Sequence, residues 1–360
     1  MRNLFPVGGS KCSTASIEGP AGLEFLAVDR FLQTPMAARA LTAALDLKLL
    51  ELLRMHGPIP RSESAHRLHL PSASAALLFN ALIEGGVLAE ADDGLALTPA
   101  FIQALRYRDL LQARIDLWRL AGTDLHEDLT ILLADPDAFM ARSRTFAAFR
   151  YDRCFELTAE NRQATWAWVR ITSTLSKYES GACVGHPAFA EATTMLDIGG
   201  NSGEFALQAC RRHPGLTATV IDLPLVCSIG REHLAHRADA ERVRFQSGDA
   251  RVADLGTAEY DLVTFKSFLH DWPDRDAAAL MARGSDALRS GGTLLIFERG
   301  PIDTTKWPLP CPVLSHLPFM HCYREADFYC ERLRSLGFVD VEVQSVMLEM
   351  TFNIITGRKP

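Results

Sequence analysis

Apolar residues recur at three- and four-residue spacings along the first third of the chain, which is typical of amphipathic helices. Residues 25–57, FLAVDRFLQTPMAARALTAALDLKLLELLRMHG, predict a long helical region. The segments 59–70 and 71–86 predict two shorter helices, and Gly85-Gly86 ends the second. Next, VLAEADDGLALTP has two short apolar runs around an Asp-Asp-Gly turn, a pattern typical of a hairpin. We therefore predict a winged-helix domain over residues 21–106.

The second half of the chain has a different pattern. Residues 107–190 are helical with interleaved aromatics, and we predict that they connect two domains and wall a substrate pocket. From Thr193 on, the apolar runs TMLDI, TATVID, VRFQ, YDLVTF and TLLIF alternate with helical stretches, the clearest over 274–292. This alternation predicts an α/β domain over 191–360, with a parallel sheet covered by helices on both faces. The last 22 residues, 339–360, predict two strands that form a hairpin at one sheet edge.

Composition and charge narrow the class of protein. With 360 residues, 48% of them hydrophobic and 22% charged, the chain has the composition of a globular protein of two domains. The net charge of -7 does not indicate a basic surface for binding nucleic acid or an anionic membrane. No apolar stretch approaches the ~18 residues of a membrane span. Residues 1–20 have no apolar signal core and are expected to form a flexible polar arm. The eight cysteines show no C-x-x-C spacing, which favours reduced thiols and a cytoplasmic location.

A winged helix also raises the possibility of a DNA-binding regulator. Between Pro60 and Ala100 the only basic residues are Arg61 and Arg67, against five acidic ones. A DNA-reading helix needs Arg or Lys for phosphates and base edges, so we interpret this domain as a packing or dimerisation module.

A glycine-rich loop follows the first strand of the α/β half. In TMLDIGGNSGEFALQACRRHPG, Gly199, Gly200 and Gly203 allow a close approach of backbone and ligand before a helix N-terminus. Such a loop alone is weak evidence, although the missing Walker Lys-Ser/Thr argues against an NTPase. The next strand ends at Asp222, where a carboxylate can hold ribose hydroxyls. NAD and S-adenosylmethionine (SAM) both fit this pattern.

The remaining strand ends decide between these ligands. Asp249 follows the third strand in SGDA, His270-Asp271 follow the fourth in KSFLHDWPD, and Glu298 ends the fifth in LLIFE. With LDIGGNSGEF and VIDLP before them, these motifs occur in the order and spacing of one family. The chain resembles the SAM-dependent small-molecule methyltransferases of the caffeic-acid and hydroxyindole O-methyltransferase type, over nearly its whole length. The resemblance implies a Rossmann-like SAM-binding domain and a homodimer formed through the N-terminal domain.

The resemblance also implies roles for single residues. Gly199 and its loop would pass the methionine part of SAM, Asp222 would bind the ribose, and Lys266 would bind the carboxylate. By this resemblance His270 falls at the position of the general base. An imidazole titrates near neutral pH, so it can take a proton from the acceptor. Asp271 and Glu298 would orient this base or the acceptor. The other expected SAM contacts are Asp197, Gly200, Leu223, Asp249 and Ala250, with the last two at the adenine.

The segment near residue 320 departs from the family pattern. Tyr323 stands where these O-methyltransferases have a second acid, and we place it at the substrate. His321 stands two residues earlier, whereas we expect His316 at the surface or a helix end. His270, Asp271 and His321 would form a two-His, one-carboxylate set suited to iron or zinc. A minority branch, the 2-oxo-acid C-methyltransferases of the phenylpyruvate and 2-ketoarginine types, is similar in this respect.

Two chemical hypotheses follow for the small-molecule acceptor. The first is metal-assisted β-C-methylation of a 2-oxo acid, with Arg153 gripping the substrate carboxylate. The alternative is O-methylation of a phenol or other hydroxyl with His270 as general base. More remote alternatives are a SAM-binding protein that does not methylate and a winged-helix regulator. We expect the aromatic residues of the connector to lie mainly in the core; they are Trp118, Phe146, Phe149, Trp166 and Trp168.

Overall fold

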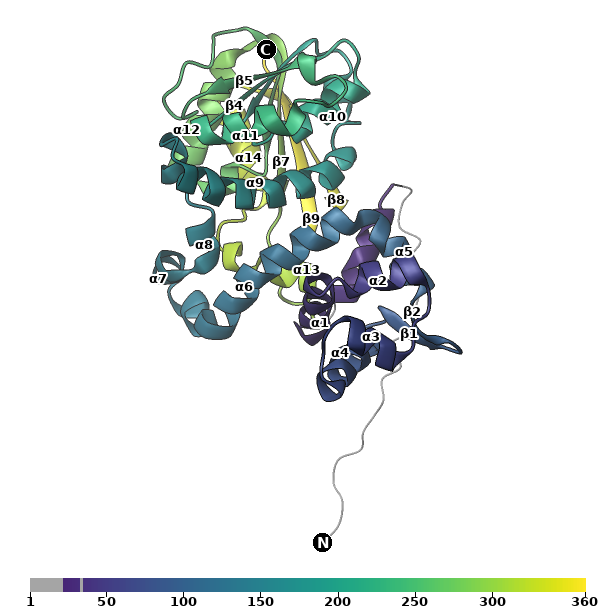
Figure 1. The fold of residues 1–360 in the computed structure, drawn as a ribbon. Coiled ribbons are helices and arrows are strands. Elements are labelled where there is room, and N and C mark those ends of the chain that lie inside the picture. Colours follow the sequence, from purple (N-terminus) through teal and green to yellow (C-terminus); the bar gives the residue numbers. More distant parts are fainter. Residues whose placement is uncertain (1–21, 33–34) are drawn as a thin grey trace.

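The computed structural model describes residues 22–32 and 35–360, so the predicted arm over 1–20, with Cys12, lies outside the described residues. A helical part and an α/β part occupy opposite ends of the molecule, with α6 and α9 side by side between them (Figure 1). The cysteines within the described ranges are free thiols, as predicted. Over the same ranges, no helix combines the length and the apolarity that crossing a membrane requires.

The N-terminal helices enclose an apolar core. Phe31 packs edge-to-face on Phe101 with 4.8 Å between ring centroids, and both side chains are buried. The predicted hairpin is present, because β1 and β2 pair antiparallel with Leu88 opposite Leu97. The elements are η1 (Glu24–Leu32), α1 (Pro35–Asp46), α2 (Leu49–His56), α3 (Arg61–Arg67), α4 (Ser72–Glu84), β1 (Leu88–Ala91), β2 (Gly94–Leu97) and α5 (Pro99–Ala104).

The connector is helical, as predicted, and a buried carboxylate holds two of its helices together. Asp124 on α6 accepts hydrogen bonds from Ser143 Oγ at 2.5 Å and from the Thr145 amide at 2.9 Å. These bonds satisfy the first turn of α8 and hold it against α6. The elements are η2 (Leu105–Tyr107), α6 (Arg108–Ala134), α7 (Pro136–Arg142), α8 (Arg144–Ala148), η3 (Asp152–Phe155), α9 (Ala159–Glu179), η4 (Ser180–Ala182) and η5 (Pro187–Phe189).

The C-terminal part contains a seven-stranded sheet in the order β5-β4-β3-β6-β7-β9-β8. Strands β3 to β7 are parallel, and the final hairpin adds β9 antiparallel to β7, with β8 at the edge. All predicted strands are present. The elements are β3 (Thr194–Ile198), α10 (Glu204–Arg212), β4 (Thr217–Asp222), α11 (Pro224–Leu234), η6 (Ala240–Arg242), β5 (Val243–Ser247), β6 (Tyr260–Lys266), η7 (Leu269–Asp271), α12 (Asp274–Ala287), β7 (Leu288–Arg299), α13 (Cys311–Leu314), η8 (Leu317–Phe319), α14 (Ala326–Ser335), β8 (Val339–Met347) and β9 (Thr351–Arg358).

One helix boundary differs from the prediction. The helix expected over 274–292 ends at Ala287, and the chain continues directly as β7. Leu288 pairs with Tyr260 on β6, so it joins the sheet. The helical period ends before a Gly-Gly pair, and the sequence pattern alone did not distinguish a last helical turn from the start of a strand.

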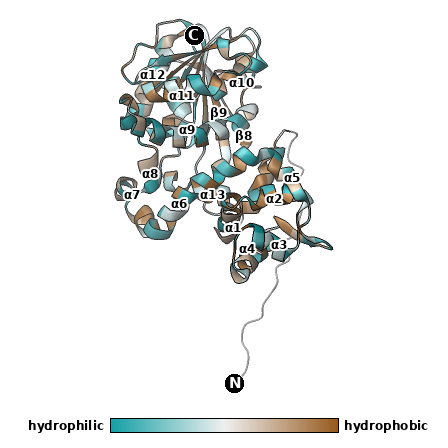
Figure 2. Cartoon of the chain, in the orientation of Figure 1, coloured by the Kyte–Doolittle hydropathy of each residue, from teal (hydrophilic) through white to brown (hydrophobic). Residues whose placement is uncertain are grey.

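The strand order reverses beside β3, which positions the site. From β3 the chain builds outward through β4 and β5, then returns to place β6 on the other side of β3. At such a reversal the loops after neighbouring strands diverge and leave a crevice at the carboxyl ends of the strands. The helices that cover the sheet carry both hydrophilic and hydrophobic residues (Figure 2), as expected for helices with one face on the core.

Candidate active site

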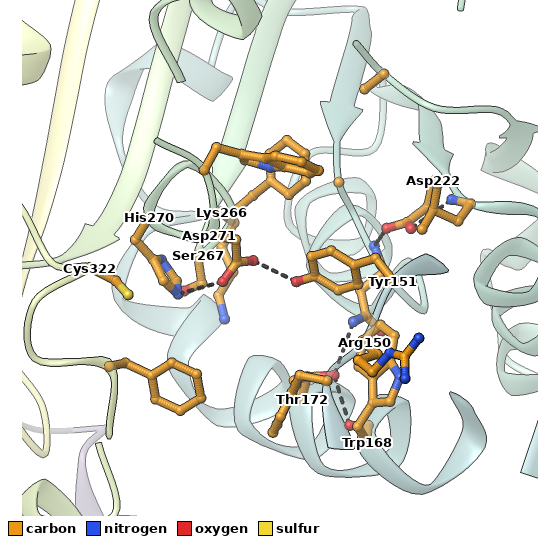
Figure 3. Close-up of a pocket in the computed structure, with 18 of the residues that line it drawn as sticks. Arg150, Tyr151, Trp168, Thr172, Asp222, Lys266, Ser267, His270, Asp271 and Cys322 are labelled. Atoms are coloured by element: carbon orange, nitrogen blue, oxygen red, sulfur yellow. Dashed lines mark hydrogen bonds and ion pairs between the residues drawn. The ribbon is translucent and has the colours of Figure 1, made fainter. Parts of the chain in front are cut away.

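A cavity of about 620 Å³ lies between the carboxyl ends of β3, β4 and β6 and the helices of the connector. One side is lined by loops after the strands, including Gly199, Asp222 and Lys266. The opposite side is lined by apolar and aromatic side chains from α6, α8, α9 and η8, among them Leu117, Phe146, Phe149, Trp168 and Phe319. Figure 3 shows His270, Asp271 and Tyr151 in a row across this cavity, with Asp222 beyond them.

The loop after β3 approaches the cavity closely. Gly199 has φ +70°, and a Cβ at this position would lie 2.3 Å from the Phe268 ring, so no side chain fits there. Asp222, at the end of β4, accepts hydrogen bonds from the Asn201 amide at 2.8 Å and from the Leu223 amide at 2.7 Å. Burial raises the pKa of Asp222 to about 6, although both amide bonds act in the opposite direction. The half-buried carboxylate therefore fixes the loop and also faces the cavity.

After β5, an ion pair between an aspartate and an arginine lies next to a tryptophan ring. Asp249 accepts a hydrogen bond from Arg251 Nη2 at 2.7 Å, and this interaction lowers its pKa. The Arg251 guanidinium lies 4.4 Å from the centre of the Trp272 ring, within cation–π range. Asp249, Ala250, Arg251 and Trp272 all line the cavity.

Lys266 reaches the cavity from the end of β6 and is held by α9. Its Nζ donates to Ser176 Oγ at 3.0 Å and forms an ion pair with Glu179. Glu179 also pairs with Arg299 at the end of β7, and its side chain is 3% exposed. Burial opposes the charge of Glu179, but Arg299 and Lys266 outweigh that effect and lower its pKa to about 2. The charged side chains of Lys266, Arg299 and Glu179 thus lie together in the lining of the cavity.

His270 lies between two carboxylates. Its Nδ1 is 2.6 Å from Glu298 Oε2, and its Nε2 is 3.4 Å from Asp271 Oδ1. The other oxygen of Glu298 accepts from the amides of Phe268 and Leu269 at 2.7 and 2.6 Å. Burial opposes a charge on His270, but Glu298 and Asp271 outweigh it and raise the pKa of His270 above its ordinary value. The imidazole is therefore strongly oriented and made more basic.

Asp271 is held from the connector. Tyr151 Oη, before η3, donates to Asp271 Oδ2 at 2.6 Å. Burial is the main cause that raises the pKa of Asp271, while His270 and the Tyr151 hydrogen bond act against it. The connector thus closes over the loop that carries His270.

The comparisons with known proteins agree with this geometry. A family model described as an O-methyltransferase domain matches residues 134–305. A 3-hydroxy-5-methyl-1-naphthoate 3-O-methyltransferase of Streptomyces sahachiroi is 27% identical over 77% of this chain and 78% of its own length. The N,N-dimethyltransferase OxyT of Streptomyces rimosus is 28% identical over 72% and 74%. The solved human N-acetylserotonin methyltransferase in complex with SAM has the same fold, with a TM-score of 0.64 at 19% identity over 90% of this chain and 94% of that chain. This protein is a SAM-dependent methyltransferase.

Most of the site residues predicted for this methyltransferase meet at the cavity. The exceptions at the SAM loop and the base are Asp197, Gly200 and Glu298, which are not part of the cavity lining. Asp197 is fully buried and accepts from Thr264 Oγ1 at 2.7 Å, and Glu298 supports His270 from behind. The predicted residues that line the cavity are Gly199, Asp222, Leu223, Asp249, Ala250, Lys266, His270, Asp271 and Tyr323.

Two predicted residues are elsewhere in the methyltransferase. Arg153 is not part of the cavity lining, and its guanidinium donates to the Ala147 carbonyl of its own segment. His321 is exposed and also lies outside the lining, whereas His316 is buried and lines the cavity. The expectations for these two histidines were therefore reversed. The short α13 and η8 turn His316 inward, and no regular period in this segment indicated its orientation.

The predicted metal set is consequently not formed. His270 and Asp271 are adjacent, but the exposed His321 does not join them at the cavity. Over residues 22–32 and 35–360, no group of three or more His, Cys, Asp or Glu side chains has an arrangement that would hold a metal ion. The relatives compared above are O- and N-methyltransferases by name, and none supports methylation of a 2-oxo acid.

The structure also adds residues that the sequence analysis missed. Tyr151 contacts the predicted Asp271 and Glu179 contacts the predicted Lys266, while Arg299 pairs with Glu179. Of the aromatics expected in the core, Trp118 and Trp168 are buried, and Trp168 also lines the cavity. Phe146 and Phe149 line the cavity, and Trp166 is exposed. The only signal in the sequence was the density of aromatics between 107 and 190, which suggested a pocket wall without naming its members.

Proposed function

We propose that this methyltransferase transfers the methyl group of SAM to a hydroxyl oxygen on the aromatic ring of a small metabolite, with His270 as the general base. The observation that carries the proposal is the fixed orientation of His270. Glu298 Oε2 lies 2.6 Å from Nδ1 and accepts the Nδ1 proton, since its carboxylate is ionised: the pKa of Glu298 is lowered by His270 and by amide hydrogen bonds, although burial opposes this. The lone pair of neutral His270 is then on Nε2, beside Asp271. Nε2 is the atom that removes the acceptor proton.

The strand ends supply the binding groups for SAM. When bound, SAM supplies an electrophilic methyl group. We assign Asp222 to the ribose hydroxyls, because a carboxylate that lines the cavity at the end of the second strand can accept from two hydroxyls at once. Asp249 and Ala250 face the adenine, and Lys266 faces the SAM carboxylate. Gly199 leaves the backbone free to approach the methionine part, since no Cβ fits there.

The aromatic wall indicates the shape of the acceptor. Phe146 and Phe149 each pack against Phe319, with centroids 5.1 and 5.9 Å apart, and Phe149 packs against Trp168 at 5.9 Å. Such a cluster provides rigid apolar faces against which a planar ring stacks. A ring held there is positioned beside His270, and positioning is most of what a methyl transfer requires from the protein.

The test is methyl incorporation from labelled SAM into a panel of phenols, naphthols, amines and 2-oxo acids, with the products identified by mass spectrometry. We expect ring hydroxyls to be methylated and His270→Ala to lower kcat by about 10³-fold with SAM affinity unchanged. His126→Ala, which removes an exposed histidine of α6, is the matched control. Methylated 2-oxo acids, or full activity of His270→Ala, would contradict the proposal.

We also propose that the helices and hairpin over α1 to β2 form a winged-helix domain through which the enzyme dimerises. Exposed apolar side chains on these helices and on α5 support the proposal; they are Met36, Met55, Leu77 and Ile102. Sedimentation velocity is expected to give the mass of two chains. A single-chain mass at micromolar concentration would refute the dimer.

A further inference from the structure

One group of polar side chains at the cavity has no role in the function proposed above. His316, after α13, and Tyr323, before α14, both line the cavity and are only 6% and 7% exposed. His316 Nδ1 lies 3.1 Å from Tyr323 Oη, within hydrogen-bond distance. The Tyr323 ring packs edge-on against His270, with 5.2 Å between ring centroids. The pair therefore adjoins the general base.

The surroundings fix the position of this pair. Arg324 donates from Nη1 to the Leu269 carbonyl at 3.0 Å, and so ties the residue next to Tyr323 to the residue next to His270. Arg324 Nε also pairs with Asp274 Oδ1 at 2.7 Å. These contacts hold the segments of Tyr323 and His270 in fixed positions relative to each other.

The surroundings also set the direction of the hydrogen bond. Burial and the charge of Arg299 lower the pKa of His316 well below its ordinary value, so this imidazole is neutral and carries one proton. Glu349 Oε1, which also accepts from Arg299 Nη2 at 3.1 Å, lies 3.7 Å from Nε2, and its negative charge favours the tautomer with the proton on Nε2. Nδ1 is then unprotonated and accepts the Tyr323 hydroxyl proton. With its proton engaged, Tyr323 Oη has only lone pairs to offer to the cavity.

We propose that Tyr323 Oη, oriented by His316 and Glu349, is a hydrogen-bond-accepting subsite that selects acceptors with a second hydroxyl or N–H group on the ring system that carries the methylated hydroxyl. A second group that only accepts hydrogen bonds, such as a methoxy or carbonyl oxygen, meets the lone pairs of Tyr323 and is disfavoured. The inference rests on the proposed function, because it concerns the choice among hydroxyl acceptors.

The experiment compares three probes at saturating SAM: 2,3-dihydroxynaphthalene, 2-naphthol and 3-methoxy-2-naphthol. We expect kcat/KM of the wild-type enzyme to be about tenfold higher for the diol than for 2-naphthol, and lowest for the methoxy compound. Tyr323→Phe keeps the ring against His270 and removes the oxygen, so the diol and 2-naphthol should fall within about twofold of each other.

A second variant tests the direction of the hydrogen bond. His316→Phe fills the same space but removes the nitrogen that accepts the Tyr323 proton. The freed hydroxyl then donates to the acceptor, so the methoxy compound should gain relative to 2-naphthol. Tyr260→Phe, at the start of β6 and outside the cavity lining, is the matched control.

The outcomes separate the subsite from the function on which it rests. Equal kcat/KM for the three probes in the wild-type enzyme would overturn the subsite, and so would an equal loss on all three in Tyr323→Phe, which would show a structural role only. If other ring hydroxyls are methylated but none of these naphthols is, the subsite fails and the proposed function stands. If no hydroxyl compound of any kind is methylated, the proposed function fails first.

Discussion

The two ends of the cavity are built in different ways. The end around Asp222 and Asp249 consists of loops that directly follow the strands of one parallel sheet, and each polar side chain is held by neighbours within its own loop or the next one. The end around His270 is assembled from both parts of the chain. Tyr151 comes from the connector, Glu298 from the end of β7, and Tyr323 from the segment before α14.

This difference separates the binding of SAM, which is the same for every acceptor, from the binding of the acceptor itself. The SAM end needs a carboxylate and a close backbone approach at fixed positions, which the sheet supplies by its topology. The acceptor end depends on how helices far apart in sequence pack over the strand ends. A substitution in the aromatic wall of the connector is therefore expected to change which acceptor fits more than it changes the groups around Asp222.

The largest effect is expected from Glu298→Gln, which acts only at the acceptor end. A glutamine amide can donate to Nδ1 and so favour the tautomer with its proton on Nε2, which cannot take the acceptor proton. We expect kcat to fall by about 10³-fold while the Kd for SAM, measured by calorimetry, stays within twofold of the wild type. Glu331→Gln, on the exposed face of α14, is the control. A parallel loss of SAM affinity would show that the two ends are not independent.

The difference between the ends also explains what the sequence predicted. The short apolar runs after Thr193 identified the strands of the sheet, because each is followed by a polar or glycine-rich turn. Asp222, Asp249 and His270 were found for the same reason, since the carboxyl ends of parallel strands meet at one edge. These are local patterns, and the fold brings them together without further information.

The other half of the site depends on contacts between distant elements. Glu179 lies at the end of an amphipathic helix, where a charged residue normally faces solvent, yet it pairs with Lys266 in the cavity lining. Helical period gives the buried face of α9 but does not show which polar residue faces a cavity. The wrong placement of His316 and His321 has a similar origin. A short helix precedes His316, and only a proline and a single 3₁₀ turn lie between the two histidines, so the segment has no regular period.

The next effect concerns the SAM end and its pH dependence. Burial raises the pKa of Asp222 to about 6 in the free enzyme, and the ionised form is the one that accepts from ribose hydroxyls. SAM affinity of the wild-type enzyme should therefore be constant above about pH 7 and decrease as the pH falls through 6. Asp222→Asn should bind SAM about 10- to 100-fold more weakly at pH 7.5, with little change at lower pH. Calorimetry across this range is the measurement, with Asp286→Asn, exposed on α12, as the control. A pH-dependent affinity that persists in Asp222→Asn would assign the titration to another group.

The smallest expected effect belongs to Arg153, a residue whose charge alone made it a candidate at the acceptor end. Its guanidinium donates to the Ala147 carbonyl, and the residue lies outside the cavity lining, so Arg153→Ala removes one local hydrogen bond of the connector. Such a loss costs about 1 kcal/mol of stability and leaves the aromatic wall in place. We expect KM for the acceptor and kcat to stay within about twofold of the wild type, measured with the acceptor that the panel identifies. Arg324→Ala is the informative contrast, because Arg324 ties the His270 loop to the segment of Tyr323 and its loss should lower kcat. If Arg153→Ala instead raised KM more than tenfold, the segment before η3 would contact the acceptor directly, and the acceptor end would extend further into the connector than the cavity lining indicates.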